Sequence, residues 1–192
     1  MAMAVRRPTH RRARLVNSAR TLADRFRTQR TDRIRVDGIE VLSLTELSIS
    51  NGDAVEVVVE QFRDDVEQSL NIRAKSGSLQ VLSHDAAEEE DEYEFDDSIT
   101  SESITLVANL HRRIEFALAA HDEERGPVTL QFWNSWLLGS TEHAWTGNSG
   151  LVAEELDVPD GADARFRLWC SDGLGDPQFD NLVVVITIGP QA

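Results

Sequence analysis

Histidines are the first residues to test for chemistry, because an imidazole can serve as a metal ligand or as a general base. No two of the five have the i, i+4 spacing of a helical metal site or the His-x-His spacing of a cupin. They are His10, His84, His111, His121 and His143. There is also no Gly-x-Ser-x-Gly elbow, and the glycines between Ser171 and Pro177 indicate a turn between two strands. The sequence therefore predicts no enzyme activity, no cofactor and no histidine metal site.

A run of acidic residues is a second candidate for chemistry. Nine of the fourteen residues from 84 to 97 are carboxylates. Calcium or magnesium would bind several such oxygens, so a cation site is one interpretation. The run lacks the spacing of an EF-hand and has no glycine to turn a binding loop. Like charges at this density resist packing, and we therefore expect a solvated loop.

Tryptophan and cysteine give a third set of candidates. Tryptophans can stack on sugar rings, but within strands they more often fill a core, so both interpretations stay open. They are Trp133, Trp136, Trp145 and Trp169. Cys170 is the only cysteine, which excludes an internal disulfide framework and a multi-cysteine metal site. We expect it to be a small buried residue.

Charge is divided unequally along the chain. Residues 1–35 contain eleven arginines and two aspartates, a net of +9, so the remaining residues carry −24 of the total of −15. A basic segment on an acidic body indicates contact with an anionic surface. Of the 19 basic residues only Lys75 is a lysine. This acid-rich, lysine-poor composition is typical of proteins adapted to high salt, and arginine-biased codon usage is the alternative.

The basic segment is predicted to contain an amphipathic helix of about four turns that begins at Arg14. The apolar residues at helical spacing are Leu15, Ala19, Leu22 and Phe26. Such a helix can pack on its own domain or a neighbouring copy, lie on an anionic bilayer, or contact nucleic acid. The arginines expected to face a membrane or another anionic surface are Arg6, Arg7, Arg11, Arg12, Arg14, Arg20, Arg25 and Arg27.

After residue 35 the pattern is that of β-strands. The turn Asn51-Gly52-Asp53 and the turn at residues 75–78 are each predicted to join a hairpin. Residues 103–120 favour two strands that bend near His111, and residues 128–138 favour one strand. Residues 182–188 are continuously apolar, which predicts a central strand covered on both faces.

These elements predict an all-β fold. About eight short strands with turn residues between them and no βαβ alternation favour a single jelly-roll β-sandwich or barrel, preceded by the basic amphipathic helix. The expected division is a basic arm and helix at residues 1–35 and a jelly-roll β-domain at residues 36–192. About 150 residues are enough for one hydrophobic core.

In its size, its composition, its β-pattern over residues 36–189 and its basic N-terminal segment, the chain resembles a family of viral proteins. These are the small single-β-barrel (vertical jelly-roll) major capsid proteins of haloarchaeal icosahedral viruses with an internal membrane. The resemblance implies a structural virion protein, a capsid tile that self-assembles through its barrel sides. It implies assembly in the host cytoplasm and a location in the capsid shell.

The same resemblance implies the partners. They are copies of the chain itself, other capsid proteins, and the anionic lipid of the internal membrane, toward which the basic N-terminal segment is directed; nucleic acid is the less favoured partner. The alternative is a nonviral β-sandwich module that binds a carbohydrate or protein ligand and carries a basic anchor.

Overall fold

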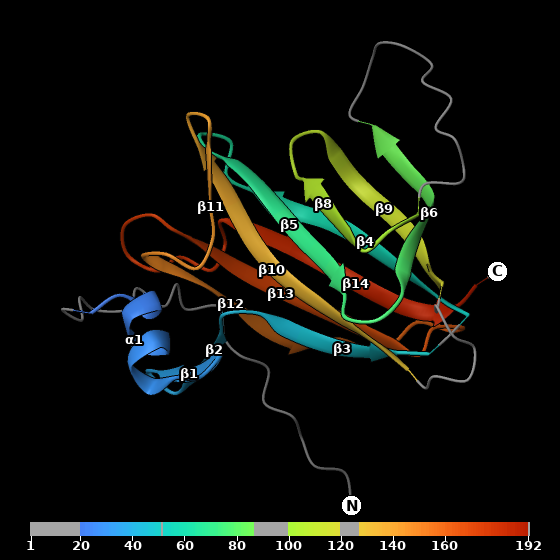
Figure 1. Ribbon diagram of the computed structural model, residues 1–192, viewed down its shortest axis with the longest axis horizontal. Helices are drawn as coiled ribbons and strands as arrows, with labels where there is room; N and C mark the ends of the chain where they lie inside the picture. The colour runs from blue at the N-terminus through green and yellow to red at the C-terminus, as the bar shows by residue number, and fades with distance from the viewer. Residues whose placement is uncertain (1–19, 51, 87–99, 120–126, 192) are drawn as a thin grey trace, which may run out of the picture.

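A computed structural model describes residues 20–50, 52–86, 100–119 and 127–191 of the chain. Within these residues the chain forms fourteen strands and one short helix (Figure 1). The predicted all-β class is therefore confirmed, but the described strands outnumber the eight or so that were predicted. Nothing helical in the described residues is long and apolar enough to cross a bilayer.

The strands form two sheets, and neighbouring strands are antiparallel. The larger sheet consists, in spatial order, of β1 (Arg33–Val36), β2 (Ile39–Leu42), β12 (Asn148–Glu155), β13 (Ala164–Gly173), β14 (Leu182–Pro190), β4 (Asp53–Phe62), β9 (His111–Ala119), β6 (Ser78–Ala86) and β7 (Thr100–Ser101). The smaller sheet consists of β11 (Thr141–His143), β10 (Val128–Leu138), β5 (Glu67–Ala74) and β8 (Ser103–Val107), with β3 (Thr45–Ile49) also paired to β10.

The main hydrophobic core lies between the two sheets, with β5 and β10 over β13 and β14 (Figure 1). Alternate residues point inward, as in Val57 of β4, Leu70 of β5 and Phe132 of β10, all fully buried. Cys170 is buried in this core as expected, and burial raises the pKa of its thiol to about 12. Both sheets therefore contribute side chains to one hydrophobic core.

The strands at residues 103–107, 111–119 and 128–138 agree with the prediction. So does β14, which lies between β13 and β4 and has five consecutive buried residues from Leu182 to Ile186. A continuous apolar run identified this strand because both of its faces are covered. The strand β6 extends to Ala86, so the predicted acidic loop begins later than residue 84, and residues 87–97 lie outside the described residues.

Both predicted hairpins are wrong. The turn at Gly52 joins β3 to β4, but β3 pairs with β10 of the smaller sheet and β4 with β14 and β9 of the larger one. The turn at Gly77 likewise joins β5 of the smaller sheet to β6 of the larger one. Apolar alternation identifies strands but not their partners, and a short turn can carry the chain across the sandwich instead of along one sheet. From β3 to β6 the chain therefore alternates between the sheets.

The helix α1 (Leu22–Gln29) is shorter than predicted. Thr21 is extended, with φ −65° and ψ 164°, and its Oγ1 accepts a hydrogen bond from the Asp24 amide at 3.2 Å. This is the geometry of an N-cap, so the helix begins at Leu22 and a continuous four-turn helix from Arg14 is wrong. Residues 14–19 lie outside the described residues. Arg30 ends the helix in the left-handed region, with φ 51°.

The helix packs on its own domain. Its buried residues join β1 and β2 in a second, small hydrophobic cluster made of Leu22, Phe26, Ile34, Val36 and Val41. The Leu22 amide donates to Asn148 Oδ1, and the Ala23 amide donates to the Gly147 carbonyl, each at 3.0 Å. The expected division after residue 35 falls inside β1, which spans Arg33–Val36. Because β1 pairs with β2 and α1 packs on both, these three elements form one N-terminal unit, which is attached to β12.

Candidate functional site

The histidines are spread over the structure. His84 and His111 lie on neighbouring strands, with ring centroids 5.4 Å apart, and His143 stacks on Trp136 at 5.9 Å. His10 and His121 lie outside the described residues. In the part of the chain that the structure describes, no group of three or more histidine, cysteine or acidic side chains could hold a metal ion.

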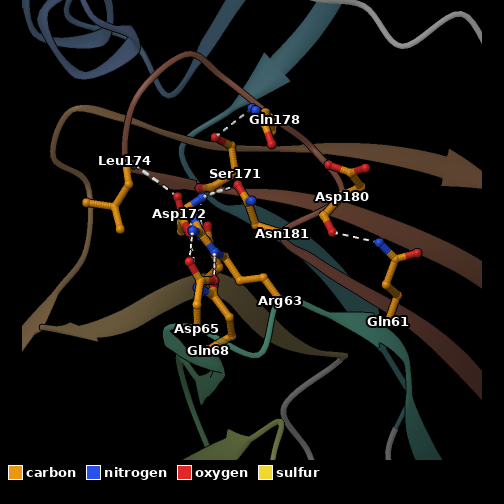
Figure 2. Close-up of polar contacts among 11 residues, drawn as sticks. Gln61, Arg63, Asp65, Gln68, Ser171, Asp172, Leu174, Gln178, Asp180 and Asn181 are labelled. Atoms are coloured by element: carbon orange, nitrogen blue, oxygen red, sulfur yellow. Dashed lines mark hydrogen bonds and ion pairs between the residues drawn. The ribbon is translucent and has the colours of Figure 1, made fainter.

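Asp172 is the only charged residue among the described ones that is buried, and its side chain is 0% exposed. Its Oδ2 accepts hydrogen bonds from Arg63 Nη1 at 2.7 Å and from Gln68 Nε2 at 3.2 Å. Its Oδ1 accepts from the Leu174 amide at 3.0 Å (Figure 2). A buried carboxylate needs such donors, because desolvation without them costs several kcal/mol.

The partners of Asp172 are themselves fixed. The guanidinium of Arg63 also donates to Asp65, with Nε 2.6 Å from Oδ1, and the Asp172 amide donates to Asn181 Oδ1 at 3.1 Å. The bonds to Asp65 and Asp172 raise the pKa of Arg63 above its ordinary value, although burial acts in the opposite direction. We call the set Arg63, Asp65, Gln68, Asp172 and Asn181 the Asp172 clamp.

Chemically, the Asp172 clamp is a structural element. The central carboxylate is fully buried and both of its oxygens accept hydrogen bonds, while the guanidinium is shared by two carboxylates, so the contacts hold these groups in fixed positions. The clamp joins the connection after β4, the start of β5, the end of β13 and residues 174–181 (Figure 2). It therefore holds together segments from both sheets at one end of the sandwich.

Sequence reasoning missed the Asp172 clamp. Arg63 and Asp172 are 109 positions apart, and neither belongs to a motif. Residues 171–177 were expected to form a turn, whereas β13 continues to Gly173 and places Asp172 inside the strand. Local pattern gives no signal for a pair of this kind, because only the pairing of distant strands brings its members together.

Six described arginines lie on or next to α1 and β1, five of them exposed, and the exposed acidic residues Asp32, Asp37 and Glu40 lie in the same segment. Arg27 of α1 and Arg33 of β1 have side chains 75% and 63% exposed, and they pair with Asp24 at 3.0 Å and Glu40 at 3.2 Å. Arg25 is half-buried and its Nη2 donates to the Arg35 carbonyl at 2.6 Å. We call the six arginines the arginine surface; they are Arg20, Arg25, Arg27, Arg30, Arg33 and Arg35.

Three of the predicted anion-facing arginines thus belong to the arginine surface, namely Arg20, Arg25 and Arg27. The other five, Arg6, Arg7, Arg11, Arg12 and Arg14, lie outside the described residues. The residues that the prediction missed are Arg30, Arg33 and Arg35, which β1 and the end of α1 bring beside the helix. Exposed ion pairs are weak, so Arg27 and Arg33 can exchange their carboxylates for another anion.

The tryptophans separate into two groups. Trp136 is 2% exposed and faces the core, which is the commoner role of a strand tryptophan. Trp169 is half-buried on the outer face of the larger sheet, and its Nε1 donates to Glu154 Oε2 at 3.0 Å. Trp133 and Trp145 stack on each other, with centroids 5.5 Å apart and an interplanar angle of 29°. Trp145 is 48% exposed.

The described residues thus carry the arginine surface on α1 and β1, the stacked pair Trp133 and Trp145, and the Asp172 clamp. Because the apolar face of α1 is buried on β1 and β2, the exposed face of this unit carries polar and charged side chains. Comparisons of the chain with protein-family models, with curated proteins and with solved structures give no match.

Proposed function

We propose that this chain is a structural shell protein of a virion, a tile that assembles beside copies of itself and holds its basic N-terminal region against an anionic lipid membrane. One observation carries the proposal. Residues 1–35 hold a net charge of +9 against −24 on the rest of the chain, and the described arginines among them gather on α1 and β1. These elements lie together at one end of the molecule (Figure 1).

The fold is compatible with this role. A two-sheet sandwich is a rigid block whose sides can make repeated contacts with neighbours. The alternation of β3, β4, β5 and β6 between the sheets supports a winding of the jelly-roll type, which is common in shell proteins. Each arginine near an anionic bilayer contributes about 1 kcal/mol, so a single copy would bind weakly and an array of copies would bind strongly.

The chemistry of arginine suits contact with phosphate at high salt. The Debye length is about 3 Å at 1 M salt, so only groups in direct contact attract each other there. Arginine forms paired hydrogen bonds with a phosphate at contact distance, whereas lysine acts as a hydrated point charge. All the basic residues of the segment 1–35 are arginines. A phosphate-bearing surface therefore suits this segment, and we assign the phosphates to lipid headgroups.

The test is flotation with liposomes in high salt, together with sedimentation of the protein alone. We expect the full chain to sediment as large assemblies and to float with phosphatidylglycerol liposomes but not with phosphatidylcholine liposomes. Replacing Arg27, Arg30 and Arg33 by Gln should reduce the bound fraction at least about tenfold at limiting lipid, since three contacts of about 1 kcal/mol are removed.

A matched control variant removes the same number of positive charges from residues outside the N-terminal unit. It replaces Arg73 of β5, Lys75 of the turn after β5 and Arg112 of β9, which are exposed and lie outside the N-terminal unit. The control should float like the full chain. Equal losses in both variants would contradict a specific arginine surface. A monomer that binds neither liposome would contradict the shell role and favour the nonviral binding module.

A further inference from the structure

Two buried polar atoms beside the Asp172 clamp have no protein partner. Gln68 and Trp136 are directly paired across β5 and β10, and they are 0% and 2% exposed. Both side chains point into the sandwich, because each residue lies an even number of positions from a core residue of its strand, Leu70 in β5 and Phe132 in β10. Among the described residues, neither Gln68 Oε1 nor Trp136 Nε1 has a hydrogen-bond partner, so the two atoms do not bond each other. Buried polar atoms of this kind destabilise a fold unless something else bonds them.

The Asp172 clamp determines which way the Gln68 amide points. A carboxylate accepts hydrogen bonds, so the amide nitrogen must face it, and Gln68 Nε2 donates to Asp172 Oδ2 at 3.2 Å. The amide oxygen Oε1 is therefore turned away from Asp172, and it can only accept. The indole Nε1 of Trp136 can only donate. The pair thus presents one acceptor and one donor inside the protein.

The Trp136 indole is held by its neighbours on other strands. The ring of His143 stacks on it, with centroids 5.9 Å apart. Gly173 lies against its six-membered ring, since a Cβ at Gly173 would be 2.7 Å from Trp136 Cη2. The Gln68 amide is held in turn by Asp172. A direct bond between Nε1 and Oε1 would therefore disturb one of these contacts.

We propose that one buried water molecule bridges Trp136 Nε1 and Gln68 Oε1. The water oxygen accepts from the indole N–H, and one water hydrogen is donated to the amide oxygen. Water is selected because it is small and neutral and has both functions, whereas a cation would be repelled by the N–H and an anion by the amide oxygen. A bridging water joins two polar atoms that lie about 4.5 to 5.5 Å apart, which is compatible with side chains of directly paired strand residues.

This water extends the Asp172 clamp to β10. A continuous chain of hydrogen bonds runs from the Trp136 indole through the water and Gln68 to Asp172 and on to Arg63. Figure 2 shows the part of the chain formed by Gln68, Asp172 and Arg63. The chain links β10 and β5 of the smaller sheet to β13 of the larger one. It uses no residue of the N-terminal unit, so it stands or falls independently of the proposed shell function.

The test is the density around Trp136 in a high-resolution structure of the full chain, from crystals or from its assemblies by electron cryomicroscopy. We expect one peak within about 3.2 Å of both Trp136 Nε1 and Gln68 Oε1. A direct bond between the two atoms, or no peak between them, would overturn the proposal. Crystals grown in bromide or in rubidium salts reveal an ion by its anomalous scattering, and an anomalous signal at the peak would also overturn it.

Two variants test whether the indole N–H holds the water. Trp136→Phe keeps an aromatic ring but removes the donor, so the peak should be lost. Trp169→Phe is the control, because the Trp169 indole donates directly to Glu154, and this variant should keep the peak. A peak that persists in Trp136→Phe would show that Gln68 holds the water without the indole, which contradicts the bridge. If Trp136→Phe does not fold, the density of the unmodified protein decides the question alone.

Discussion

Arg63 and Arg33 are both paired with carboxylates, yet they have different roles. The side chain of Arg63 is 28% exposed and meets Asp172, which has no exposed surface, whereas the side chain of Arg33 is 63% exposed and meets Glu40, which is 43% exposed. Removing one member of a buried pair leaves an uncompensated charge, while an exposed pair exchanges with water and salt at little cost. An arginine of the body therefore stabilises the fold, and one of the N-terminal unit stays available to a partner.

The largest effect is expected in the Asp172 clamp. Asp172→Ala removes the acceptor of Arg63, Gln68 and the Leu174 amide, so we expect a loss of about 3 kcal/mol in the free energy of unfolding. Urea denaturation followed by tryptophan fluorescence would measure it. Asp176→Ala, an exposed aspartate in the following turn, is the control and should stay within about 0.5 kcal/mol. Equal stability of the two variants would contradict the clamp.

A second effect tests how firmly the N-terminal unit is attached. Phe26→Ala should cost about 2 kcal/mol, the transfer term of one buried aromatic ring, because the small cluster at the edge of the domain can relax into the space. Hydrogen exchange of residues 22–29 should increase while the main core stays protected. Leu110→Ala, at a residue 53% exposed, should leave the exchange unchanged. Normal protection of α1 in the Phe26 variant would show that other contacts hold the helix.

The strands were predictable and most of their partners were not. The run of β14 and the alternation of β10 are local signals of burial, which the sequence carries directly. The partners of β3 and β5 depend on whether the turn after each strand stays in one sheet or crosses to the other. The residues near Gly52 and Gly77 do not indicate which of the two occurs. The Asp172 clamp depends on those partners, so it was hidden as well. The start of α1 was misjudged because apolar spacing continued through Thr21, whose capping bond is stronger evidence than periodicity.

A smaller and gradual decrease in the free energy of unfolding should accompany acidification. Hydrogen bonds from Arg63 hold the pKa of Asp65 below its ordinary 3.8, and the bond from Lys75 holds the pKa of Glu46 below 4.5. In the N-terminal unit the bond from Thr21 does the same for the pKa of Asp24. Their folded pKa values lie below the unfolded ones, so the unfolded state takes up more protons as the pH falls.

The stabilisation by these carboxylates is therefore complete above the unfolded pKa values and is lost as the pH falls through the folded ones. We expect the urea midpoint to be constant from pH 7 to about pH 5 and to decrease below about pH 4. In Asp65→Asn the decrease should be shallower. An acid limb that is identical in this variant would show that other carboxylates control it.

The smallest effect is expected on the arginine surface. Arg33→Gln breaks an exposed pair with Glu40 and should change the free energy of unfolding by no more than about 0.5 kcal/mol. The same variant should still weaken liposome flotation. A large loss of stability would show that Arg33 resembles Arg63, and the distinction between structural and available arginines would then disappear.

The position of β14 means that the larger sheet cannot be completed before the end of the domain is made. It follows every other described strand in the sequence, yet it lies between β13 and β4 and joins the two halves of the larger sheet, pairing Ile188 with Val55. On a translating ribosome, β4 is made early, but its partner β14 is made only when nearly the whole domain has been synthesised. Such distant pairings make folding slow. Until β14 arrives, the exposed edge of β4 is a site where nascent chains can pair with each other and aggregate.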